Sequence, residues 1–315
     1  MSIRALAPEL AEKAREQFQE DPERLQDALQ EIRNWLALQP HIHARTDDQW
    51  LVAYIRGCKF NLEKVKTKLD LFYTCRHTCK EFYQLHHKDE KFKELMASGF
   101  YLPLPKLSNP AAPRVTLLRI GVFDIAKIGA VNAFAAAHVV DKILMVDDDN
   151  AIIAGNIVII DFKGTTLMHF VQLTPIQMRM LIASQQDALP FSSVSTFIVI
   201  NVPKGLNEFI IMVKKLLNAT EEDQFYTYSE NYEEIYTLHG LTRDIMPVEY
   251  GGNGGTLQEL TDHWVGKIEE YSEWLEEDLQ FGTDESKRPG MPRTTESMFG
   301  EPLPNDRNFL QNLNL

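Results

Sequence analysis

The spacing of apolar residues along the chain changes from helical to strand-like near residue 99. Before that point apolar side chains recur every three or four residues, as an amphipathic helix requires, for example at Leu25, Leu29, Ile32 and Leu36. Asp21 and Pro22 precede this run and are typical of a helix start, because Asp caps free amides and Pro lacks an N–H that would stay unpaired there. Residues 1–98 are therefore predicted to form a small bundle of helices.

The stretch 155–203 reads as strand, helix and strand. Ile157–Phe162 and Val194–Asn201 are continuous, largely β-branched apolar runs, which are typical of strands buried on both faces of a sheet. Between them, Thr174 and Gln177 occupy the two positions of a capping box at the start of a helix. This order predicts a βαβ crossover with two parallel strands at the centre of a covered sheet.

The remaining pattern completes an α/β unit and adds a C-terminal extension. A further strand is predicted at 115–123, with helices at 130–146, 205–217 and 230–238. After a Gly-rich closing loop, 257–279 is predicted to form one acidic amphipathic helix, and the sequence from Gly282 onward is expected to be irregular because it is rich in Pro, Gly and charge. The predicted segments are an N-terminal helical domain, an α/β domain, a C-terminal acidic helix and a tail, at 1–98, 99–255, 256–281 and 282–315.

Charge and composition exclude several classes of function. The chain has 32 Lys plus Arg against 45 Asp plus Glu, a formal net charge of −13. This balance argues against nucleic acid as a partner, because such binding depends on cationic contacts to phosphate. No secretory signal and no apolar run of about 20 residues is present, so a membrane span is not expected. Three cysteines form no even set, which fits a reducing, cytoplasmic location.

Two polar motifs favour loops over binding sites. Gly251–Gly255 contains four glycines, but its spacing does not fit a dinucleotide or P-loop fingerprint, so a loop that needs positive φ is the better interpretation. Asp147–Asn150 lacks the glycine and distant Glu of a calcium loop, and it is predicted to be a solvated turn.

Neither a metal site nor an active site is expected. Cys75 and Cys79 lie four residues apart with His77 between them, but no second Cys or His pair stands at ligand spacing, and His86–His87 are adjacent in the chain. Buried thiols are the preferred interpretation, and no resident cofactor is expected. No local motif pairs a nucleophile with a base. Although a triad assembled in space would be invisible to this test, we do not predict an enzyme.

Several short motifs together resemble the CRAL-TRIO, or Sec14-like, family of lipid-binding proteins. Trp50–Arg76 is similar to the family's N-terminal helical segment, and Ile159–Gly164 to its central strand ending in Asp and Gly. Asn201–Pro203 resembles the Asn-x-Pro after the last core strand, and Pro247–Gly252 the P-x-E-Y-G-G close. The resemblance covers about 25–280. It is strongest to the tocopherol-transfer and retinaldehyde-binding branch, including insect members with tails like DESKRPG.

This resemblance implies an α/β fold in which a helical N-terminal domain precedes a mostly parallel sheet, an apolar ligand cavity and a lid helix. It implies a non-enzymatic intracellular carrier that encloses one hydrophobic molecule such as a tocopherol, retinoid, carotenoid or related isoprenoid. Carried over by position, the residues expected around the ligand are His138, Ile160, Leu167, Leu173, Leu181, Ser184, Leu189, Phe191 and Phe197. His138 either hydrogen-bonds a ligand hydroxyl or carbonyl, or is satisfied by backbone.

The helix expected after Pro203 is apolar on more than one side. One stripe comprises Leu206, Phe209, Ile210, Val213 and Leu217. A helix that is apolar all round is normally buried, and the alternative, favoured by the resemblance, is a lid that covers the ligand and makes transient contact with a membrane during exchange.

The chain departs from phosphoinositide-binding relatives at the basic positions of their headgroup cleft. Ser192, Ser193, Ser195 and the stretch 220–224 stand where those relatives carry Lys and Arg. Because phosphate recognition needs converging cations, we do not expect phosphoinositide binding at this cleft. The principal hypothesis is a hydrophobic-ligand carrier. The alternatives are a lipid-regulated protein-interaction module that uses the acidic helix at 269–278 and, third, a lipid-modifying enzyme.

Overall fold

The computed structural model describes residues 2–170, 172–191, 195–203, 225–228, 233–239 and 241–300. The N-terminal part is helical, as predicted. Its helices are α1 (Pro8–Phe18), α2 (Pro22–Ala37), α3 (Asp48–Gly57), α4 (Leu62–Thr78), the 3-10 turn η1 (Lys80–Phe82) and α5 (Glu90–Ala97). The Asp21, Asp47 and Asn61 side chains cap the starts of α2, α3 and α4.

Among the described residues, the central sheet has five strands in the order β2-β3-β4-β5-β6, with bounds Tyr101–Pro103, Arg114–Arg119, Asn156–Asp161, Ser195–Ile200 and Phe225–Thr227. The β3–β4, β4–β5 and β5–β6 pairs are parallel, and only β2 runs antiparallel to its neighbour. Ile159 of β4 is aligned with Leu117 of β3 and Ile198 of β5. The prediction of a mostly parallel sheet with β4 and β5 at its centre is confirmed.

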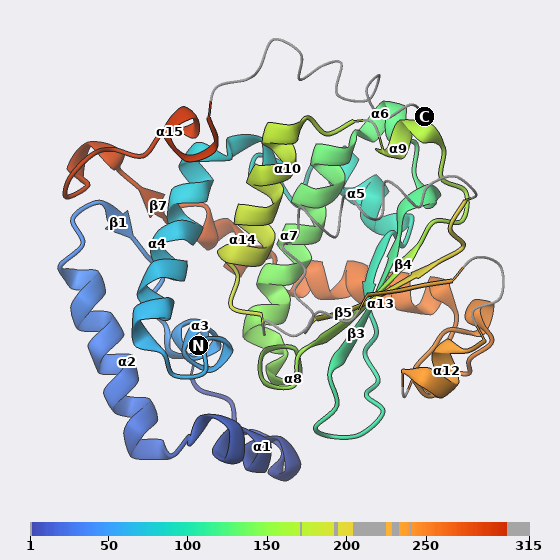
Figure 1. The fold of residues 1–315 in the computed structure, drawn as a ribbon, viewed down its shortest axis with the longest axis horizontal. Coiled ribbons are helices and arrows are strands. Elements are labelled where there is room, and N and C mark those ends of the chain that lie inside the picture. The colour runs from blue at the N-terminus through green and yellow to red at the C-terminus, as the bar shows by residue number, and fades with distance from the viewer. Residues whose placement is uncertain are drawn as a thin grey trace.

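Helices and short turns complete the α/β part of the molecule. They are η2 (Ile120–Val122), α6 (Ile125–Ile128), α7 (Ala130–Asp147), α8 (Asp149–Ile153), α9 (Leu167–Phe170), α10 (Pro175–Ile182), the π-helical turn η3 (Ala183–Asp187), α12 (Ile235–Leu238) and η4 (Val248–Tyr250). In Figure 1, α7 lies between the N-terminal helices and the sheet. The helix predicted at 205–217 lies outside the described residues.

The N-terminal helices share a core with the α/β part. Trp50, Tyr54, Leu69 and Phe72 are fully buried in one cluster that also contains Met145, Val146 and Ile152 of α7 and α8. Ion pairs join the same surfaces, since Arg56 lies 3.0 Å from Asp149 of α8 and 2.8 Å from Glu20. The helical segment is therefore packed onto the α/β part by both apolar and charged contacts.

The acidic run at 147–150 is not the solvated turn that the sequence suggested. The Asp148 side chain caps α8, and Asp148 and Asp149 are 7% and 8% exposed. Asp149 pairs with Arg56 and Arg4, and Asp148 with Arg114. The cationic partners come from distant parts of the chain, which is why the local sequence suggested solvent.

Two further differences concern the C-terminal extension. The helix predicted at 257–279 is divided at Tyr271 into α13 (Leu257–Glu270) and α14 (Ser272–Asp278). The described part of the tail is structured, with β7 (Gly282–Thr283), η5 (Glu285–Lys287) and α15 (Thr295–Phe299). Strand β7 pairs antiparallel with β1 (Ile42–His43). The tail thus returns to the N-terminal helices, which its composition did not indicate.

The motifs that carried the family resemblance meet in space. Asn201 Nδ2 donates to Asp161 Oδ1 at 2.7 Å, and the Tyr250 hydroxyl donates to Asp161 Oδ2. Gly251 has a φ of +78°, and a Cβ on Gly252 would lie 2.1 Å from the Met246 carbonyl oxygen. The glycines therefore allow a tight closing loop, as predicted.

Candidate ligand-binding site

The two faces of the central strands differ in how completely they are covered. Successive side chains of a strand point to opposite faces. Ile159, Ile198 and Ile200 are each 0% exposed, in one cluster with α7 and α13. On the other face, Ile160 and Phe197 are only half-buried. A parallel sheet is normally covered on both faces, so the second face has apolar surface that the described residues do not fully cover.

The covered and open parts of that second face can be separated. Val199 and Phe162 are buried there, in a small cluster to which Ile160 and Phe225 contribute. Ile160 and Phe197 stay partly exposed, and the ring centroid of Phe197 lies 5.8 Å from that of Phe225. Both central residues were predicted to contact a ligand.

Helix α10 follows β4 and carries other predicted contact residues. Its capping box is formed, since the Thr174 hydroxyl accepts the Gln177 N–H and the Gln177 side chain accepts the Thr174 N–H. Leu181 packs with Phe82 and Cys75 in a cluster that Leu173 borders. Ser184 is 1% exposed, and its hydroxyl donates to the Leu181 carbonyl at 3.1 Å. It lies in η3, a π-helical turn of the kind often found at functional sites.

Lys68 of α4 closes the end of η3. Its ammonium group donates to the carbonyl oxygens of Gln186, Asp187 and Leu189 at 3.1, 2.6 and 2.8 Å. Burial lowers the pKa of Lys68 to about 8. These bonds satisfy carbonyls that a helix end leaves unpaired. They also attach the end of η3 to α4 of the N-terminal domain.

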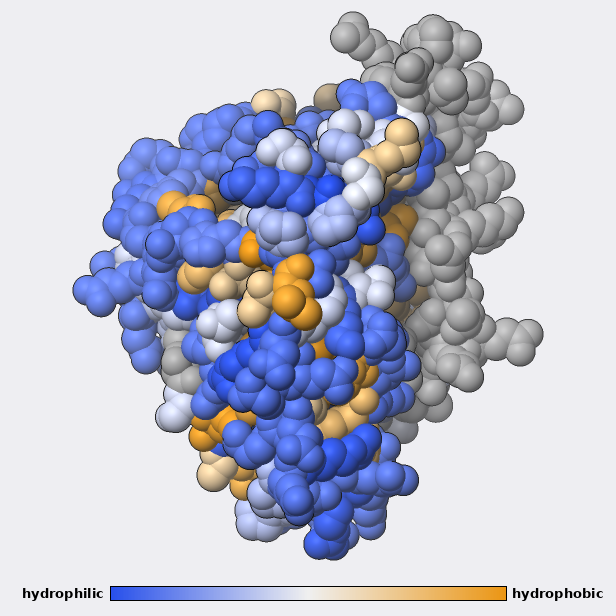
Figure 2. Space-filling model, turned by 90° about the vertical axis from the view of Figure 1, so that its left-hand side faces the viewer, coloured by the Kyte–Doolittle hydropathy of each residue, from blue (hydrophilic) through white to orange (hydrophobic). Residues whose placement is uncertain are grey.

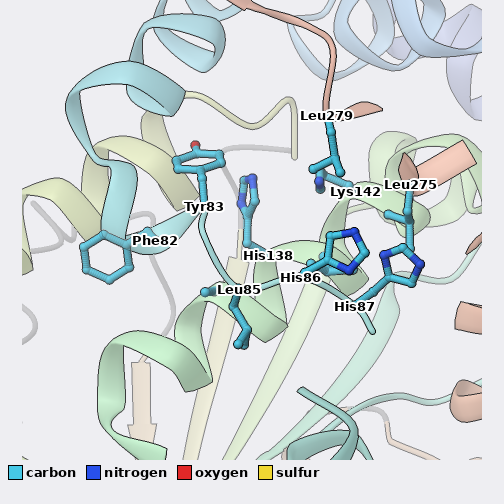
Figure 3. Close-up of a pocket in the computed structure, with 11 residues that line it drawn as sticks. Phe82, Tyr83, Leu85, His86, His87, His138, Lys142, Leu275 and Leu279 are labelled. Carbon is cyan, nitrogen blue, oxygen red and sulfur yellow. The ribbon is translucent and has the colours of Figure 1, made fainter. Parts of the chain in front are cut away.

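His138 lies at a cavity of about 30 Å³ between α7, η1, the chain at 83–87 and α14 (Figure 3). The lining is mixed, with Phe82, Leu85, Leu275 and Leu279 beside Tyr83, His86, His87 and Lys142. His138 is 2% exposed, and its ring centroid is 4.6 Å from that of Tyr83. A volume of this size admits a water molecule or one small polar group.

The polar atoms at this cavity lack partners within the described chain. Within the described residues, neither ring nitrogen of His138 has a hydrogen-bond partner, and the Tyr83 hydroxyl has none either. Burial and the positive charges of Lys142 and Arg76 lower the pKa of His138 well below 6.5, so the ring is neutral near pH 7. The Gln185 side chain opposes this shift, and its amide nitrogen donates to the Phe134 carbonyl at 3.4 Å. A neutral ring offers one donor and one acceptor, and leaving both unpaired in the interior is costly.

A buried ion cluster borders the cavity on the α14 side. Asp278 is fully buried and accepts from Lys142 Nζ at 2.8 Å and from the Arg76 guanidinium. Burial would raise the pKa of Asp278, but Lys142 and Arg76 outweigh it and hold the carboxyl well below its usual range. Sequence reasoning missed this cluster and Tyr83, because their partners come from segments that the sequence does not connect.

The described residues place the predicted contact residues in several neighbourhoods. Ile160 and Phe197 lie on the open sheet face, Leu173 and Leu181 in the α10 cluster, and His138 at the small cavity. Phe82 borders both of the latter two. Leu189 is 1% exposed in the N-terminal core, and Phe191 packs between that core and the sheet core. The Leu167 side chain and the lid residues Leu206, Phe209, Ile210, Val213 and Leu217 lie outside the described residues.

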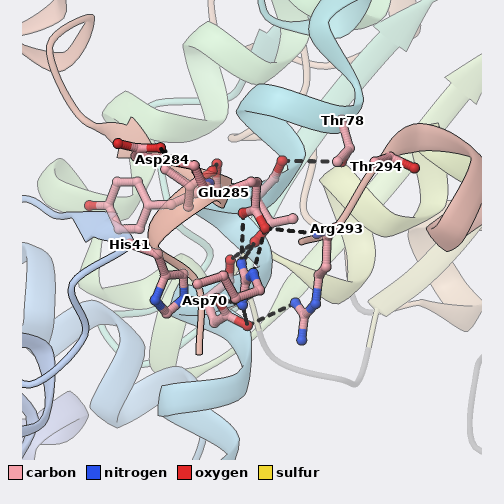
Figure 4. Close-up of polar contacts among 12 residues, drawn as sticks. His41, Asp70, Thr78, Asp284, Glu285, Arg293 and Thr294 are labelled. Carbon is pink, nitrogen blue, oxygen red and sulfur yellow. Dashed lines mark hydrogen bonds and ion pairs between the residues drawn. The ribbon is translucent and has the colours of Figure 1, made fainter. Parts of the chain in front are cut away.

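The charged side chains that hold the tail are paired with side chains of opposite charge (Figure 4). The unpaired polar atoms at the His138 cavity are in contrast to them. Arg288 donates to both oxygens of Asp70, at 2.9 and 3.1 Å, and to Glu285. Arg293 lies 2.8 Å from Asp70. We call Asp70, Glu285, Arg288 and Arg293 the tail clamp. A further bond, from Arg179 to the Phe299 carbonyl at 2.8 Å, attaches the tail to α10.

The remaining sequence-based expectations concern the cysteines and the surface. Cys75 and Cys79 are buried, as predicted, and Cys58 is buried as well. Among the described residues, no helix is long and apolar enough to cross a membrane. The side of the molecule that carries α2, β1 and the tail is mostly hydrophilic, with small apolar patches (Figure 2).

Comparison with known proteins agrees with this architecture. Residues 21–90 match the Pinta-like UBA domain, and residues 109–252 match the CRAL/TRIO domain. The human alpha-tocopherol transfer protein-like protein is 26% identical over 82% of this chain and 74% of its own length. Rat clavesin-2 is 24% identical over 85% and 83%. The solved structure "Crystal structure of Sfh5" aligns at 13% identity over 66% of this chain and 71% of that one, with a TM-score of 0.42, too low to carry an argument. Residues 109–252 therefore form a CRAL/TRIO domain, the domain of the CRAL-TRIO, or Sec14-like, proteins.

Proposed function

We propose that this protein is a carrier that binds one hydrophobic small molecule of the isoprenoid type and exchanges it at membranes. The observation that carries the proposal is the incompletely covered apolar face around Ile160 and Phe197, in strands whose opposite face buries Ile159 and Ile198 completely. Apolar surface left in water costs about 25 cal/mol per Å². A hydrophobic ligand, covered in turn by the helix predicted at 205–217, would remove that cost.

We propose that His138 binds an uncharged polar group, at a position separate from Ile160 because α7 packs against the Ile159 face of the sheet. A ligand hydroxyl can donate to one ring nitrogen of His138 and accept from the Tyr83 hydroxyl. One ligand group would then give a hydrogen-bond partner to both side chains. Phe82 links this cavity to the α10 cluster that contains Leu181. A ligand with an apolar body and one uncharged polar group is therefore the best match, and the names of the tocopherol-transfer-like relatives agree with such a molecule.

The alternative of an interaction module that uses the acidic helix receives less support. Glu276 of α14 is paired with Lys88, Glu277 with Arg45, and Asp278 with Lys142 and Arg76. These acids are occupied within the chain, so fewer charges remain to attract a basic partner. The proposed binding and exchange of a ligand require neither catalysis nor a resident cofactor.

Native mass spectrometry of the purified full chain tests the carrier proposal. The protein should retain one apolar molecule per chain, which is released by denaturation and identified in the organic extract. A protein that carries no ligand and takes up none of a tocopherol, retinoid and carotenoid panel would exclude the carrier function.

Membrane exchange is expected not to depend on phosphoinositides. The basis is the sequence at the usual basic cleft, where Ser192, Ser193 and Ser195 replace cations. Co-sedimentation with liposomes should change little when a few per cent of bisphosphorylated phosphatidylinositol is added. A tenfold rise, or about 1.4 kcal/mol, would mean that a basic site exists elsewhere.

A further inference from the structure

Two adjacent histidines and one distant carboxylate converge at the mouth of the His138 cavity. His86 Nε2 lies 3.3 Å from Glu276 Oε2, and His87 Nε2 lies 3.7 Å from Glu276 Oε1. One ligand atom from each of the three residues lies within 4.8 Å of the other two. We propose that His86, His87 and Glu276 form a binding site for a divalent transition-metal ion, with Zn²⁺ the ion that this ligand set favours.

The chemistry of the three groups supports this assignment. Two imidazoles and one carboxylate are ligands that Zn²⁺ prefers, at bond lengths of about 2.0–2.2 Å. Bonds of that length in a tetrahedron place neighbouring ligand atoms about 3.3–3.6 Å apart. The observed separations of 3.3 and 3.7 Å from the two imidazole nitrogens to the carboxylate are close to that spacing.

Burial and surroundings make the arrangement a formed site. The His87 side chain is 5% exposed, that of His86 28% and that of Glu276 38%, so the ligands lie at the edge of the interior. The two imidazole rings are nearly parallel, with centroids 4.5 Å apart, and they stand side by side in Figure 3. Both rings line the His138 cavity. A fourth metal position can therefore be taken by water or by a ligand atom from the cavity.

Three existing contacts would have to change when an ion binds, and one of them is on a proposed ligand atom, since His87 Nε2 lies 3.0 Å from the Ser272 hydroxyl oxygen. Lys88 Nζ lies 2.5 Å from Glu276, and the Lys88 backbone N–H donates to His86 Nδ1 at 3.1 Å. A metal on Nε2 favours an Nδ1 that donates a hydrogen bond, so this backbone bond would be lost. Metal binding competes with these contacts, and the site is therefore expected to be weaker than a structural zinc site.

The site could not have been found from local sequence. The histidines and the carboxylate are 190 positions apart, on the segment before α5 and on α14. The ligands come from the N-terminal and C-terminal parts of the chain, so a bound ion would also connect these two parts.

Calorimetric titration of the metal-free full chain with ZnCl₂ tests the proposal. One equivalent of Zn²⁺ should bind, and Glu276→Gln should weaken this binding at least about tenfold, or about 1.4 kcal/mol. Glu273→Gln is the matched control, since it makes the same charge change at an exposed position of the same helix. His263→Gln removes an exposed histidine elsewhere and should also leave binding unchanged. Co²⁺ in place of Zn²⁺ should give the visible absorption of a low-symmetry four-coordinate ion.

Two results would overturn the proposal. One is the absence of saturable binding of one equivalent, and the other is equal affinity in Glu276→Gln and the wild type. Because Glu276→Gln can also disturb the Lys88 pair, thermal melts without metal show whether the variant is folded, and His87→Gln provides an independent loss of one ligand. The proposal does not depend on the carrier function, and native mass spectra of the same samples record lipid and metal separately.

Discussion

Ile159 and Ile160 are neighbours in one central strand, yet they lie in different surroundings. Ile159 is 0% exposed in the main core, whereas Ile160 on the opposite face is half-buried. Residue type and strand position are the same, so propensity cannot explain the difference. What differs is the volume of protein against each face. The comparison shows that the core fills one face, whereas the described residues cover the other face only in part.

The same contrast exists among buried polar groups. In the tail clamp, Arg288 meets both Asp70 and Glu285. At the cavity, His138 has no hydrogen-bond partner in the described chain for either nitrogen. Paired groups stabilise the fold, and an unpaired buried group indicates a missing partner. The two contrasts are separate observations, and each agrees with the ligand binding proposed above.

Truncating the two isoleucines should give the largest difference. Ile159→Ala should lower the free energy of unfolding by roughly 2–5 kcal/mol, because it leaves a cavity in a packed core. Ile160→Ala in ligand-free protein should cost less than about 1.5 kcal/mol, since its side chain is already partly exposed. Urea unfolding at matched concentration measures both. Equal losses would show that the two faces are packed alike and would remove the basis of the carrier proposal.

A smaller effect is expected from the pH dependence of the tail clamp. Burial would raise the pKa of Glu285, but hydrogen bonds from Arg288 and the Arg293 N–H outweigh it and bring the pKa from 4.5 to about 2. A depressed pKa contributes stability that is present above about pH 4.5 and is lost as the pH falls toward 2. Glu285→Gln should reduce this loss by about 1 kcal/mol, the order expected for a partly screened pair.

Unfolding free energies at pH 7 and at pH 3 would check this prediction. Asp284→Asn at the neighbouring, more exposed position is the control for a simple change of charge. Hydrogen bonds from Lys287 and Ser286 also lower the pKa of Asp284, against the smaller effect of burial. An identical pH slope in Glu285→Gln and wild type would mean that the clamp carboxylate is not stabilised as described.

The smallest effect on stability is expected at His138. His138→Leu removes two unpaired polar atoms and keeps a side chain of similar volume, so the ligand-free protein should change by less than about 1 kcal/mol. Affinity for a hydroxyl-bearing ligand should fall at least about tenfold, or about 1.4 kcal/mol. Tyr83→Phe should act in the same direction, and fluorescence titration would measure both. Unchanged affinity in a folded His138→Leu protein would place the polar end of the ligand elsewhere.

The order of elements could be predicted from the sequence because it depends on local signals. The apolar runs at 157–162 and 194–201 form β4 and β5, and the Thr174 capping box starts α10. The tail and the acidic run at 147–150 could not be predicted. Their charges are paired with Asp70, Arg56 and Arg114, which lie far away in the chain, so composition alone suggested exposure to solvent.

The candidate site was only partly accessible to sequence reasoning. Alternation along β4 shows that Ile159 and Ile160 point apart, but it does not show which face is filled. His138 could be singled out by its position on α7, whereas its unpaired state depends on Phe72, Tyr83 and Lys142, which reach it through tertiary packing. Convergence of His86, His87 and Glu276 is likewise a property of the fold.

The most direct test of the central claim is to fill the space against Ile160. Ile160→Trp should leave the unfolding free energy of ligand-free protein within about 1 kcal/mol of wild type, because the added ring enters unoccupied volume, and native mass spectra should show that the bound hydrophobic molecule is lost. Ile159→Trp is the control and should be destabilised by roughly 1–3 kcal/mol or more through overpacking. If Ile160→Trp is destabilised as strongly as Ile159→Trp, and wild-type protein carries no ligand, the space does not exist and the carrier account is contradicted.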